Sequence, residues 1–387
     1  MRPTYNAQPI GSIDSLALSL GISPSSLVAL ASSASDRYST FSIPKKEAGQ
    51  FREVCGPDHE LKRAQKRINR TIFEKVSYPN YLYGGIAERD YLKNACAHAN
   101  ARSLIALDVR NFYSNITATE VHKIFKYFCH FPEDVARTLT QLTTKDGRVP
   151  QGACTSSHIA NLVFFDTEHM VVRELQQRGL RYSRLLDDIT ISAEKLITQE
   201  HTTKIIDKVK ILLADKHLKL KVKKTRVSSS SNPETLMEVT GLWLNRGSPR
   251  VFRSERHDIR AQLFRLERLR KISGTDPAYH EEHNRVSGRV SKVAYVGHFE
   301  AEEFRRRLRM ILPRYDAREV ARTLRLVELV CAAPPHQRNN LSYIDKYHNV
   351  IYRLGVLSRT NRELSFKQRA RVLKCAPSVG KEDLLYG

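Results

Sequence analysis

The sequence predicts an α+β fold in which antiparallel strands are backed by helices. In the segment "DITIS" at 188–192 apolar and polar residues alternate, which is the period of a half-buried strand. The run "SLIALDV" at 103–109 is apolar enough for a strand buried on both faces. Three longer stretches instead favour amphipathic or buried helices: 58–76, 158–178 and 255–272.

The other elements are predicted from local signals along the chain. Further strands are expected in a hairpin over 38–54, with its turn near 47–50, and in a strand-like segment over 237–245. Further helices are expected in a short preface at 12–32, after the capping box of Thr117 and Glu120, near 198–217, and over 300–312. Loops are expected at the serine run 228–231 and at "HEEHN", 280–284, whose histidines lack the i, i+4 spacing of a metal motif.

Length and composition indicate a soluble globular protein. A chain of 387 residues can bury a substantial core and form two or three domains or lobes. No apolar run is long enough to span a bilayer, and residues 1–35 lack the pattern of a secretory signal, so we expect a cytoplasmic protein without a membrane partner. The six cysteines lie far apart with no C-x-x-C pair, which favours reduced thiols over disulfides or a zinc ribbon.

The charge of the chain points to a polyanionic partner. The net charge is +23 and the pI is near 9.8. From Arg246 to Gly387, 30 Lys and Arg stand against 16 Asp and Glu, so +14 falls in the last 142 residues and +9 in the first 245. A surface that is only solubilising usually mixes both signs, so this arginine excess favours nucleic acid.

Two adjacent carboxylates, Asp187 and Asp188, stand where the strand at 188–192 begins. Taken alone they fit an ordinary hairpin turn, because an Asp side chain bonds its own backbone nearby. Asp108, near the end of the strand at 103–109, supplies a third carboxylate. Three acids brought together repel each other, a cost that a structural turn has no reason to bear. We therefore expect them to hold two divalent ions about 3.5–4 Å apart for phosphoryl transfer on nucleic acid.

An aromatic residue follows the first of these acids. Tyr113, after Phe112, leaves the strand that carries Asp108, where a ring can lie beneath the sugar of an incoming nucleotide. Such a ring would clash with a 2′-hydroxyl. The alternative is that Tyr113 is simply a core residue.

From about Tyr38 to Asn245 the chain resembles reverse transcriptases, and among them the retron type of bacteria. The motifs occur in family order: "IPKKEAGQFR" resembles the fingers hairpin, "LDVRNFYSNI" the first catalytic motif, "VPQGACTSSHIANL" the nucleotide-pocket motif, "RLLDDITIS" the acidic hairpin and "LKVKKTRV" the later lysine motif. "NACAH" at 94–98 is similar to the N-A-x-x-H of the retron type, and "VTG" at 239–241 to its V-T-G.

The resemblance implies a right-hand polymerase, with fingers, a palm of antiparallel sheet and a basic helical thumb. The expected parts are a helical preface at 1–37, fingers at 38–100, a palm at 101–247 with a fingers contribution near 125–150, a thumb at 248–330, and a segment at 331–387 that enlarges the thumb or docks a partner.

The resemblance also implies roles for single residues at the reacting centre. Asp108, Asp187 and Asp188 would hold two Mg²⁺ ions, or Mn²⁺ in their place, and the Val109 carbonyl would add a ligand. Lys224 would protonate the leaving pyrophosphate.

Further residues would contact the substrates. The residues implied for the dNTP are Lys45 and Arg52 at the triphosphate, Tyr113 as the sugar gate, and Gln151 and Gly152 in the pocket floor. Those implied for selecting the cognate structured noncoding RNA are Asn94, His98, Val239, Thr240 and Gly241. For the latter group a structural role is the alternative, with His98 as a core histidine and 239–241 as a strand end.

The chain departs from the family pattern in two motifs. Leu185 and Leu186 replace the usual Tyr and Ala before the two acids, next to the expected primer end, which puts fidelity, rate or primer preference in question. Cys154 and Ser157 stand where proline is commoner in the pocket motif. Since both acids remain, we do not infer an inactive enzyme.

The leading hypothesis is an RNA-directed DNA polymerase of retron type, which copies part of a cognate RNA into RNA-linked DNA and acts in phage defence with a separate effector protein. One alternative is another defence-associated reverse transcriptase, primed by protein or unprimed, and another is an inactive RNA-binding scaffold. A viral RNA-dependent RNA polymerase is disfavoured by Tyr113, and a group II intron maturase by the lack of a Cys/His cluster after the thumb.

Overall fold

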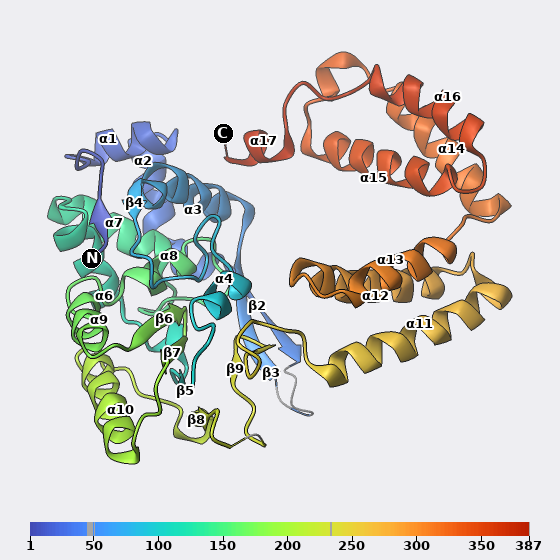
Figure 1. Cartoon of the computed structure of the whole chain (residues 1–387). Coiled ribbons are helices and arrows are strands. Elements are labelled where there is room, and N and C mark those ends of the chain that lie inside the picture. The colour runs from blue at the N-terminus through green and yellow to red at the C-terminus, as the bar shows by residue number, and fades with distance from the viewer. Residues whose placement is uncertain (45–48, 50, 233, 387) are drawn as a thin grey trace. The chain divides into compact units, whose positions relative to one another are not determined.

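The computed structural model describes residues 1–44, 49, 51–232 and 234–386, and the chain forms two compact units, Met1–Pro249 and Arg250–Gly387 (Figure 1). Lys45 and most of the turn expected near 47–50 lie outside the described residues. Each unit has its own buried apolar residues. The break between the units comes two residues after the thumb was expected to begin.

The first unit contains ten helices among its described residues: α1 (Ile13–Leu20), α2 (Pro24–Ser32), α3 (His59–Thr71), α4 (Tyr91–Cys96), α5 (Phe112–Asn115), α6 (Ala118–Lys123), α7 (Glu133–Thr143), α8 (Ser156–Leu162), α9 (Glu168–Gln177) and α10 (Gln199–Ala214). Side-chain caps start several of them: Ser12, Ser23 and Asp58 each accept a backbone N–H of the first turn. The helical preface and the helices near 58–76 and 198–217 are therefore confirmed.

The strands of this unit form a four-stranded sheet and three two-stranded pairs in the part described. The pairs are β1 (Thr4–Tyr5) with β4 (Val76–Ser77), β2 (Tyr38–Pro44) with β3 (Phe51–Pro57), and β9 (Glu238–Val239) with β10 (Leu242–Trp243). The predicted hairpin over 38–54 is confirmed as β2 and β3. The strand-like segment over 237–245 is divided by a turn, because Thr240 and Gly241 take positive φ of 46° and 78°.

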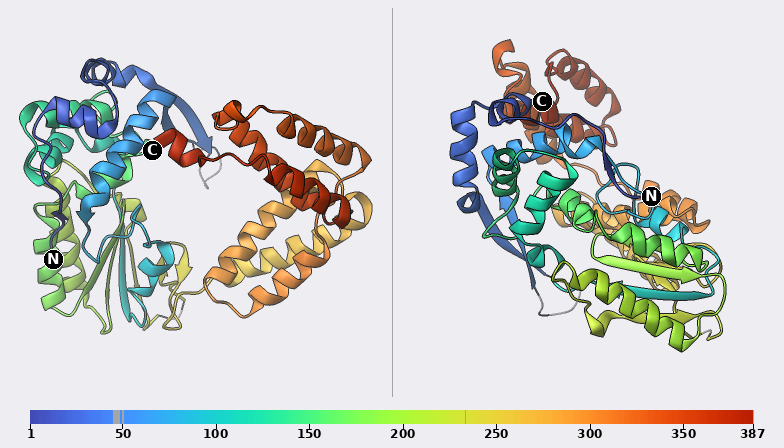
Figure 2. Two further views of the ribbon diagram at one scale, coloured as in Figure 1. Left: turned by 90° about the horizontal axis from the view of Figure 1, so that it is seen from above. Right: turned by 90° about the vertical axis from the view of Figure 1, so that its left-hand side faces the viewer.

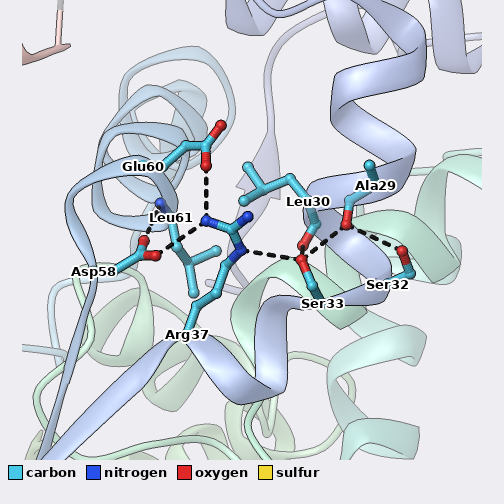
Figure 3. Close-up of polar contacts among 8 residues, drawn as sticks. All are labelled: Ala29, Leu30, Ser32, Ser33, Arg37, Asp58, Glu60 and Leu61. Carbon is cyan, nitrogen blue, oxygen red and sulfur yellow. Dashed lines mark hydrogen bonds and ion pairs between the residues drawn. The ribbon is translucent and has the colours of Figure 1, made fainter.

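Arg37 fixes the base of the β2–β3 hairpin (Figure 3). Its guanidinium donates to Asp58 at 3.0 Å and to Glu60 at 2.7 Å, at the start of α3, and to the Ser33 hydroxyl at 3.0 Å, after α2. Asp58 also caps α3 through the Leu61 amide. One side chain thus joins the residue before β2 to the start of α3 and to the residue that follows α2.

The four-stranded sheet has the order β6 (Arg181–Leu185), β7 (Asp188–Ala193), β5 (Ser103–Asp108) and β8 (Arg226–Ser229), all antiparallel. On one face, Ile105 and Leu107 of β5 lie opposite Ile191 and Ile189 of β7 and are buried. The helices α9 and α10 lie beside the sheet (Figure 2) and contribute to the same core through Val172, Leu175, Val209 and Leu212. Because side chains alternate along a strand, Ala106, Asp108, Asp188 and Thr190 point to the other face.

Two local predictions were wrong and a third was wrong in part. The stretch 158–178 is two helices, α8 and α9, with a turn between them. The carbonyls of Ala160 and Asn161 accept from the Arg184 guanidinium, a partner distant in sequence that local periodicity does not reveal. Ser228 and Ser229 lie in β8, because pairing with β5 overrides their weak strand propensity, whereas 230–231 form a turn as expected. The segment 280–284 is helical, within α12 (Pro277–Tyr295), and its His283 is buried.

The second unit is helical throughout its described residues, with α11 (Arg253–Ser273), α12, α13 (Glu300–Met310), α14 (Ala317–Cys331), α15 (Leu341–Leu357), α16 (Arg362–Leu373) and α17 (Lys381–Tyr386). The predicted helices over 255–272 and 300–312 correspond to α11 and α13. The helices α14, α15 and α16 share a buried cluster that includes Val327, Val350, Leu354 and Val372. The boundary expected at 330/331 thus falls at the end of α14, a helix that packs on the segment beyond it.

None of the described helices is by itself long and apolar enough to cross a membrane. The helices α1 and α2, which meet at 92°, pass the criteria of length and composition only when taken together. Both bury leucines in the core of the first unit, among them Leu16, Leu20, Leu27 and Leu30.

Candidate active site

Two carboxylates face each other across paired strands. The register of β5 and β7 sets Asp108 directly opposite Asp188. Directly opposed residues of antiparallel strands point to the same face, here the face away from the α9 and α10 core. The fold thus brings together two acids that are far apart in the sequence.

Asp187 joins them from the turn between β6 and β7. Leu186 has a positive φ of 60°, which ends β6 and turns the chain toward β7. The Val109 amide donates to the Asp187 carbonyl at 3.0 Å, and the Lys221 amide donates to the Asp108 carbonyl at 2.8 Å. Backbone hydrogen bonds therefore fasten the segments that carry the acids to one another.

The three carboxylates act on each other electrostatically. Loss of surrounding water, together with the charges of Asp187 and Asp108, raises the pKa of Asp188 to about 6. The pKa of Asp187 is also raised, first by burial and then by the charge of Asp108. Asp188 is not enclosed, because part of its surface remains exposed to solvent. The groups that lie around its carboxylate therefore displace the water.

Lys224 offsets part of this negative charge. It lies in a 3₁₀ turn (Val222–Lys224), and its Nζ is 2.7 Å from Oδ2 of Asp108. This hydrogen bond, followed by the charges of all three acids, raises the pKa of Lys224. One ammonium beside three carboxylates leaves a net negative cluster, which is the electrostatic setting that attracts a divalent cation.

The acids open onto a groove on the exposed face of the sheet. One hollow of about 320 Å³ is lined by Ala106, Leu107, Asp108, Asp188, Lys223, Lys224 and Arg226. A second hollow of about 360 Å³ shares Asp188 and Arg226 with it and extends to Tyr91, Leu185, Glu238, Thr240 and Gly241. Arg226 donates to Glu238 at 2.8 Å across this second hollow. Lysines and arginines beside the acids suit the groove to a sugar–phosphate strand.

Two of the expected nucleotide residues lie within electrostatic range of Asp187. Burial and the charge of Asp187 raise the pKa of the half-buried Tyr113 to about 12. The guanidinium of Arg52, on β3, opposes the raised pKa of Asp187. Lys45, expected beside Arg52 at the triphosphate, lies outside the described residues.

The pocket-floor residues pack against the β2–β3 hairpin. The Gln151 carbonyl accepts from the Cys55 amide at 2.8 Å. Gly152 has a φ of 112°, and a Cβ there would lie 2.5 Å from the Val54 side chain and 3.1 Å from the Cys55 carbonyl. Glycine is therefore required by the close approach of β3 as well as by its backbone conformation.

A metal site is not preformed among the described residues, since no group of three or more His, Cys, Asp or Glu side chains there is arranged to hold an ion. The donor chemistry still fits Mg²⁺, because three carboxylates on fastened backbone segments supply the hard oxygen ligands that it prefers. The contact of Lys224 with Asp108 engages one of these oxygens. Lys224 and a bound ion would therefore compete for this oxygen.

Known proteins similar to this chain in sequence are reverse transcriptases. Residues 43–298 match the family model described as reverse transcriptase (RNA-dependent DNA polymerase). The Retron Se72 reverse transcriptase of Salmonella heidelberg (strain 579083-10) is 35% identical over 97% of this chain and 99% of its own length. The chain belongs to the retron reverse transcriptase family. It is thus an RNA-directed DNA polymerase with the right-hand fold, and it takes RNA as its template.

Two further similarities accompany this assignment. The Retron Ec48 reverse transcriptase of Escherichia coli is 33% identical to this reverse transcriptase, over 95% of this chain and 91% of its own. A solved structure of apo telomerase from Candida tropicalis, truncated from its C-terminal domain, matches with a TM-score of 0.38 and 12% identity, over 56% of this chain and 55% of that one.

The N-A-x-x-H residues of this reverse transcriptase lie buried in the first unit, where His98 contacts the four-stranded sheet. Asn94 and His98 are both fully buried. His98 bonds the hydroxyls of Ser183 on β6 and Ser192 on β7, each at 2.7 Å, and burial lowers its pKa to about 3. This placement favours the structural alternative for these two residues, and their role in selecting the RNA stays a prediction.

The V-T-G residues of the reverse transcriptase divide between core and groove. Val239 is buried, whereas Thr240 and Gly241 form the β9–β10 turn and line the second hollow. The Thr240 hydroxyl donates to the Tyr91 carbonyl at 2.8 Å, which fastens the turn to the start of α4. Contact of Thr240 and Gly241 with nucleic acid stays a prediction.

Leu186, which replaces the usual alanine before the two acids, packs against Gly84. A Cβ on Gly84 would lie 2.3 Å from Cγ of Leu186 and 3.0 Å from its amide nitrogen. The Asn161 amide group donates to the Gly84 carbonyl at 2.5 Å, so α8 holds this glycine in place. The larger side chain before the acids thus has a matching space in the loop beside it.

Sequence reasoning missed two groups near the acids. Arg226 joins the two hollows, and its charge opposes the raised pKa of Asp188. Arg184 is fully buried beside Glu168, beneath the acidic turn. The available signal was the alternation along β6, which places Arg184 on the same face as Tyr182, the core face.

Proposed function

We propose that this reverse transcriptase joins deoxynucleotides to a primer by two-metal-ion nucleotidyl transfer, with Asp108, Asp187 and Asp188 as the metal ligands. The observation that carries the proposal is the register that opposes Asp108 and Asp188, with Asp187 fastened beside them. Two bound Mg²⁺ ions, or Mn²⁺, would lower the pKa of the attacking 3′-hydroxyl and offset charge on the departing pyrophosphate. The Val109 carbonyl is an additional candidate ligand.

The residues around the acids have separate tasks in this proposal. Arg52, and Lys45 with it, bind the triphosphate of the dNTP, where cations offset the charge that grows in the transition state. Lys224, which is protonated and borders the acids, gives a proton to the leaving pyrophosphate. Tyr113 occupies the space that a 2′-hydroxyl would need. Gln151 and Gly152 shape the pocket by holding it against β3.

We further propose that the template is a cognate structured noncoding RNA, copied into RNA-linked DNA, and that the product serves anti-phage defence with an effector protein. The support is the match to retron reverse transcriptases over 97% and 95% of this chain. Protein-primed or unprimed synthesis is the competing proposal. A branched RNA–DNA hybrid that copurifies and is cut by debranching supports the retron reaction, whereas DNA attached to Tyr or Ser supports the competing one.

The catalytic assignment is tested by primer extension on an RNA template with Mg²⁺ and dNTPs. The wild type should extend the primer, and Asp187→Asn should reduce the rate by at least about 10³-fold, because the amide cannot replace the carboxylate as a charged ligand. Binding of the RNA should be unchanged in this variant. Equal extension by both proteins would overturn the assignment and favour the inactive-scaffold alternative.

A further inference from the structure

The acidic turn rests on a fully buried arginine. Arg184, on β6, has no exposed surface, and Glu168, the first residue of α9, is 2% exposed. Arg184 donates from Nε to one oxygen of Glu168 at 2.6 Å and from Nη2 to the other at 2.8 Å. The two side chains thus form a bidentate ion pair, the most directional form that such a pair takes.

The remaining hydrogens of the guanidinium go to backbone carbonyls. Nη1 donates to Ala160 at 2.9 Å and Nη2 to Asn161 at 3.0 Å, the two carbonyls that the break between α8 and α9 leaves without helical partners. Nη1 also reaches the carbonyl of Leu186 at 3.3 Å. Leu186 is the left-handed residue directly before Asp187, so this contact ends on the peptide that leads into the first acid of the turn.

Other contacts restrict the arginine itself. Its guanidinium carbon lies 5.1 Å from the centre of the Phe164 ring. Its backbone is bonded to the segment 81–83, with its amide donating to the Tyr81 carbonyl at 2.7 Å and its carbonyl accepting from the Tyr83 amide at 2.9 Å. Glu168 is in turn oriented by the Tyr182 hydroxyl, which donates to it at 2.8 Å. The pair therefore has one geometry, defined from several elements.

A buried ion pair of this kind contributes little to the net stability of a fold. Removing two charges from water costs several kcal/mol per ion, and well-packed apolar replacements are often neutral or stabilising. A planar fork can instead join carbonyls and a carboxylate of separate elements at fixed angles, which no apolar side chain can do. The contacts of Arg184 run from the α8–α9 break to the turn that carries Asp187.

We propose that Arg184 and Glu168 are positioning residues, which hold the Leu186–Asp187 peptide so that Asp187 can bind metal together with Asp108 and Asp188. This inference rests on the metal role given to the acids under Proposed function. Neither residue touches substrate; both act through the turn. Residues that orient metal ligands from behind typically change affinity or activity by about 10–100-fold when replaced.

The test uses two variants of the full-length protein. Arg184→Lys keeps the charge beside Glu168 but cannot reach Glu168, Leu186 and the α8 carbonyls at once. The double variant Arg184→Met/Glu168→Leu removes both charges and keeps apolar volume. Binding of Mn²⁺, followed by loss of the free-ion EPR signal, and the rate of primer extension should both fall by about 10–100-fold in each variant. Circular dichroism should show the wild-type helix content.

A matched control removes a buried cation that has no contact with the turn. Lys216 is 4% exposed and pairs with Asp166, Asp215 and Glu120. Lys216→Met should lower the melting temperature but leave Mn²⁺ affinity and the extension rate close to wild type. A merely structural role for Arg184 predicts the same pattern for Arg184→Lys, and that result would overturn the proposal.

Asp187→Asn separates failure of this inference from failure of the proposed function. If Asp187→Asn loses Mn²⁺ binding and extension while both Arg184 variants keep them, the positioning role is wrong and the metal role stands. If Asp187→Asn keeps both properties, the metal role is wrong and the positioning role falls with it. Should the double variant not fold, the Mn²⁺ affinity of Arg184→Lys decides.

Discussion

At the scale of single residues, Tyr113 combines a core position with a place beside the acids. Its ring lies 5.8 Å from that of Phe112, centre to centre, so it packs on the core of the first unit while remaining half-buried. The charge of Asp187 contributes to the raised pKa of the phenol, so the ring also lies within electrostatic range of the acidic turn. The two interpretations of Tyr113, core residue and sugar gate, are therefore compatible.

We predict that Tyr113→Ala admits ribonucleotides. Removing the ring opens the space that a 2′-hydroxyl needs, and the ratio of rNTP to dNTP incorporation should rise by at least about tenfold. Single-nucleotide extension with each substrate measures this ratio. Tyr113→Phe is the matched control and should keep the wild-type ratio, because the ring rather than the hydroxyl excludes the sugar. An unchanged ratio in Tyr113→Ala would contradict the gate.

His98 makes stability depend on pH in a defined direction. Its pKa is lowered to about 3 in the folded protein, mainly by burial and then by the charge of Arg181, against about 6.5 in an unfolded chain. Between these pH values the unfolded chain binds a proton that the folded chain does not. The contribution of the neutral His98 to the free energy of unfolding is therefore fully present above pH 6.5 and is lost as the pH falls toward 3. His158, whose pKa burial lowers to about 4, acts in the same direction.

We predict that His98→Gln reduces this acid sensitivity. Glutamine keeps polar contact with the serines but does not titrate, so the free energy of unfolding should fall less steeply between pH 6 and 4, by up to about 1.4 kcal/mol per pH unit. Urea unfolding at constant ionic strength gives these slopes. His201→Gln, at an exposed position on α10, serves as the control and should keep the wild-type slope. Equal slopes for His98→Gln and wild type would count against the neutral buried imidazole.

At the scale of elements, the acidic hairpin is held from both faces of the sheet. Arg184 bonds it from the core face, and His98 bonds Ser183 and Ser192 from the other. Beside it, the loop that contains Gly84 runs next to β6 through the Leu82–Arg184 bridge. A hairpin restrained on three sides can keep two neighbouring acids in one arrangement despite their repulsion.

We predict that Gly84 and Leu186 are energetically coupled. Gly84→Ala places a Cβ 2.3 Å from Cγ of Leu186, so the hairpin must shift and primer extension should fall by at least about tenfold. Adding Leu186→Ala removes the side-chain clash, and the double variant should recover part of the lost rate. Recovery should be incomplete, because the Leu186 amide also lies 3.0 Å from the added carbon. Additive effects in this double-mutant cycle would show that the two positions are independent.

Helices and strands whose signals lie within a few residues could be predicted from the sequence. Features that involve partners distant in the sequence could not. The capped helices α1 and α2 and the strand β5 follow from spacing and caps within a few residues. The carbonyls at the α8–α9 break are bonded by Arg184, and β8 pairs with β5; both partners are distant in the sequence and lie outside any local window. The same division applies to the site: the acids stood out as a motif, whereas Arg184 and Glu168 gain meaning only from their contact.

At the scale of the whole molecule, positive charge is distributed over both units. The second unit, Arg250–Gly387, has 29 Lys and Arg against 16 Asp and Glu, and the first has 35 against 25. Many of the arginines in the second unit are already paired; Arg307 with Glu267 and Arg353 with Glu319 are examples. The residues available to RNA phosphates are therefore fewer than the composition suggests.

We predict a steep salt dependence of RNA binding, with a distinct contribution from α13. Each phosphate that a cation neutralises releases counterions, so about six such contacts should weaken binding roughly 10³-fold between about 50 and 200 mM salt. Arg305 and Arg309 are exposed on α13, and neither has an ion pair within the described part of the chain. Replacing both by Gln should reduce the slope of log affinity against log salt by about 2.

Arg306, on the same helix, provides the control for that slope. It is bonded to Glu303 through both Nε and Nη2 at 2.8 Å, so much of its charge is already neutralised before RNA binds. Arg306→Gln should therefore change the slope by less than about 1. Fluorescence anisotropy with a structured RNA at five or more salt concentrations measures all three proteins. An affinity that does not change with salt would contradict the electrostatic account, and equal slopes for the three proteins would remove α13 from the RNA-binding surface.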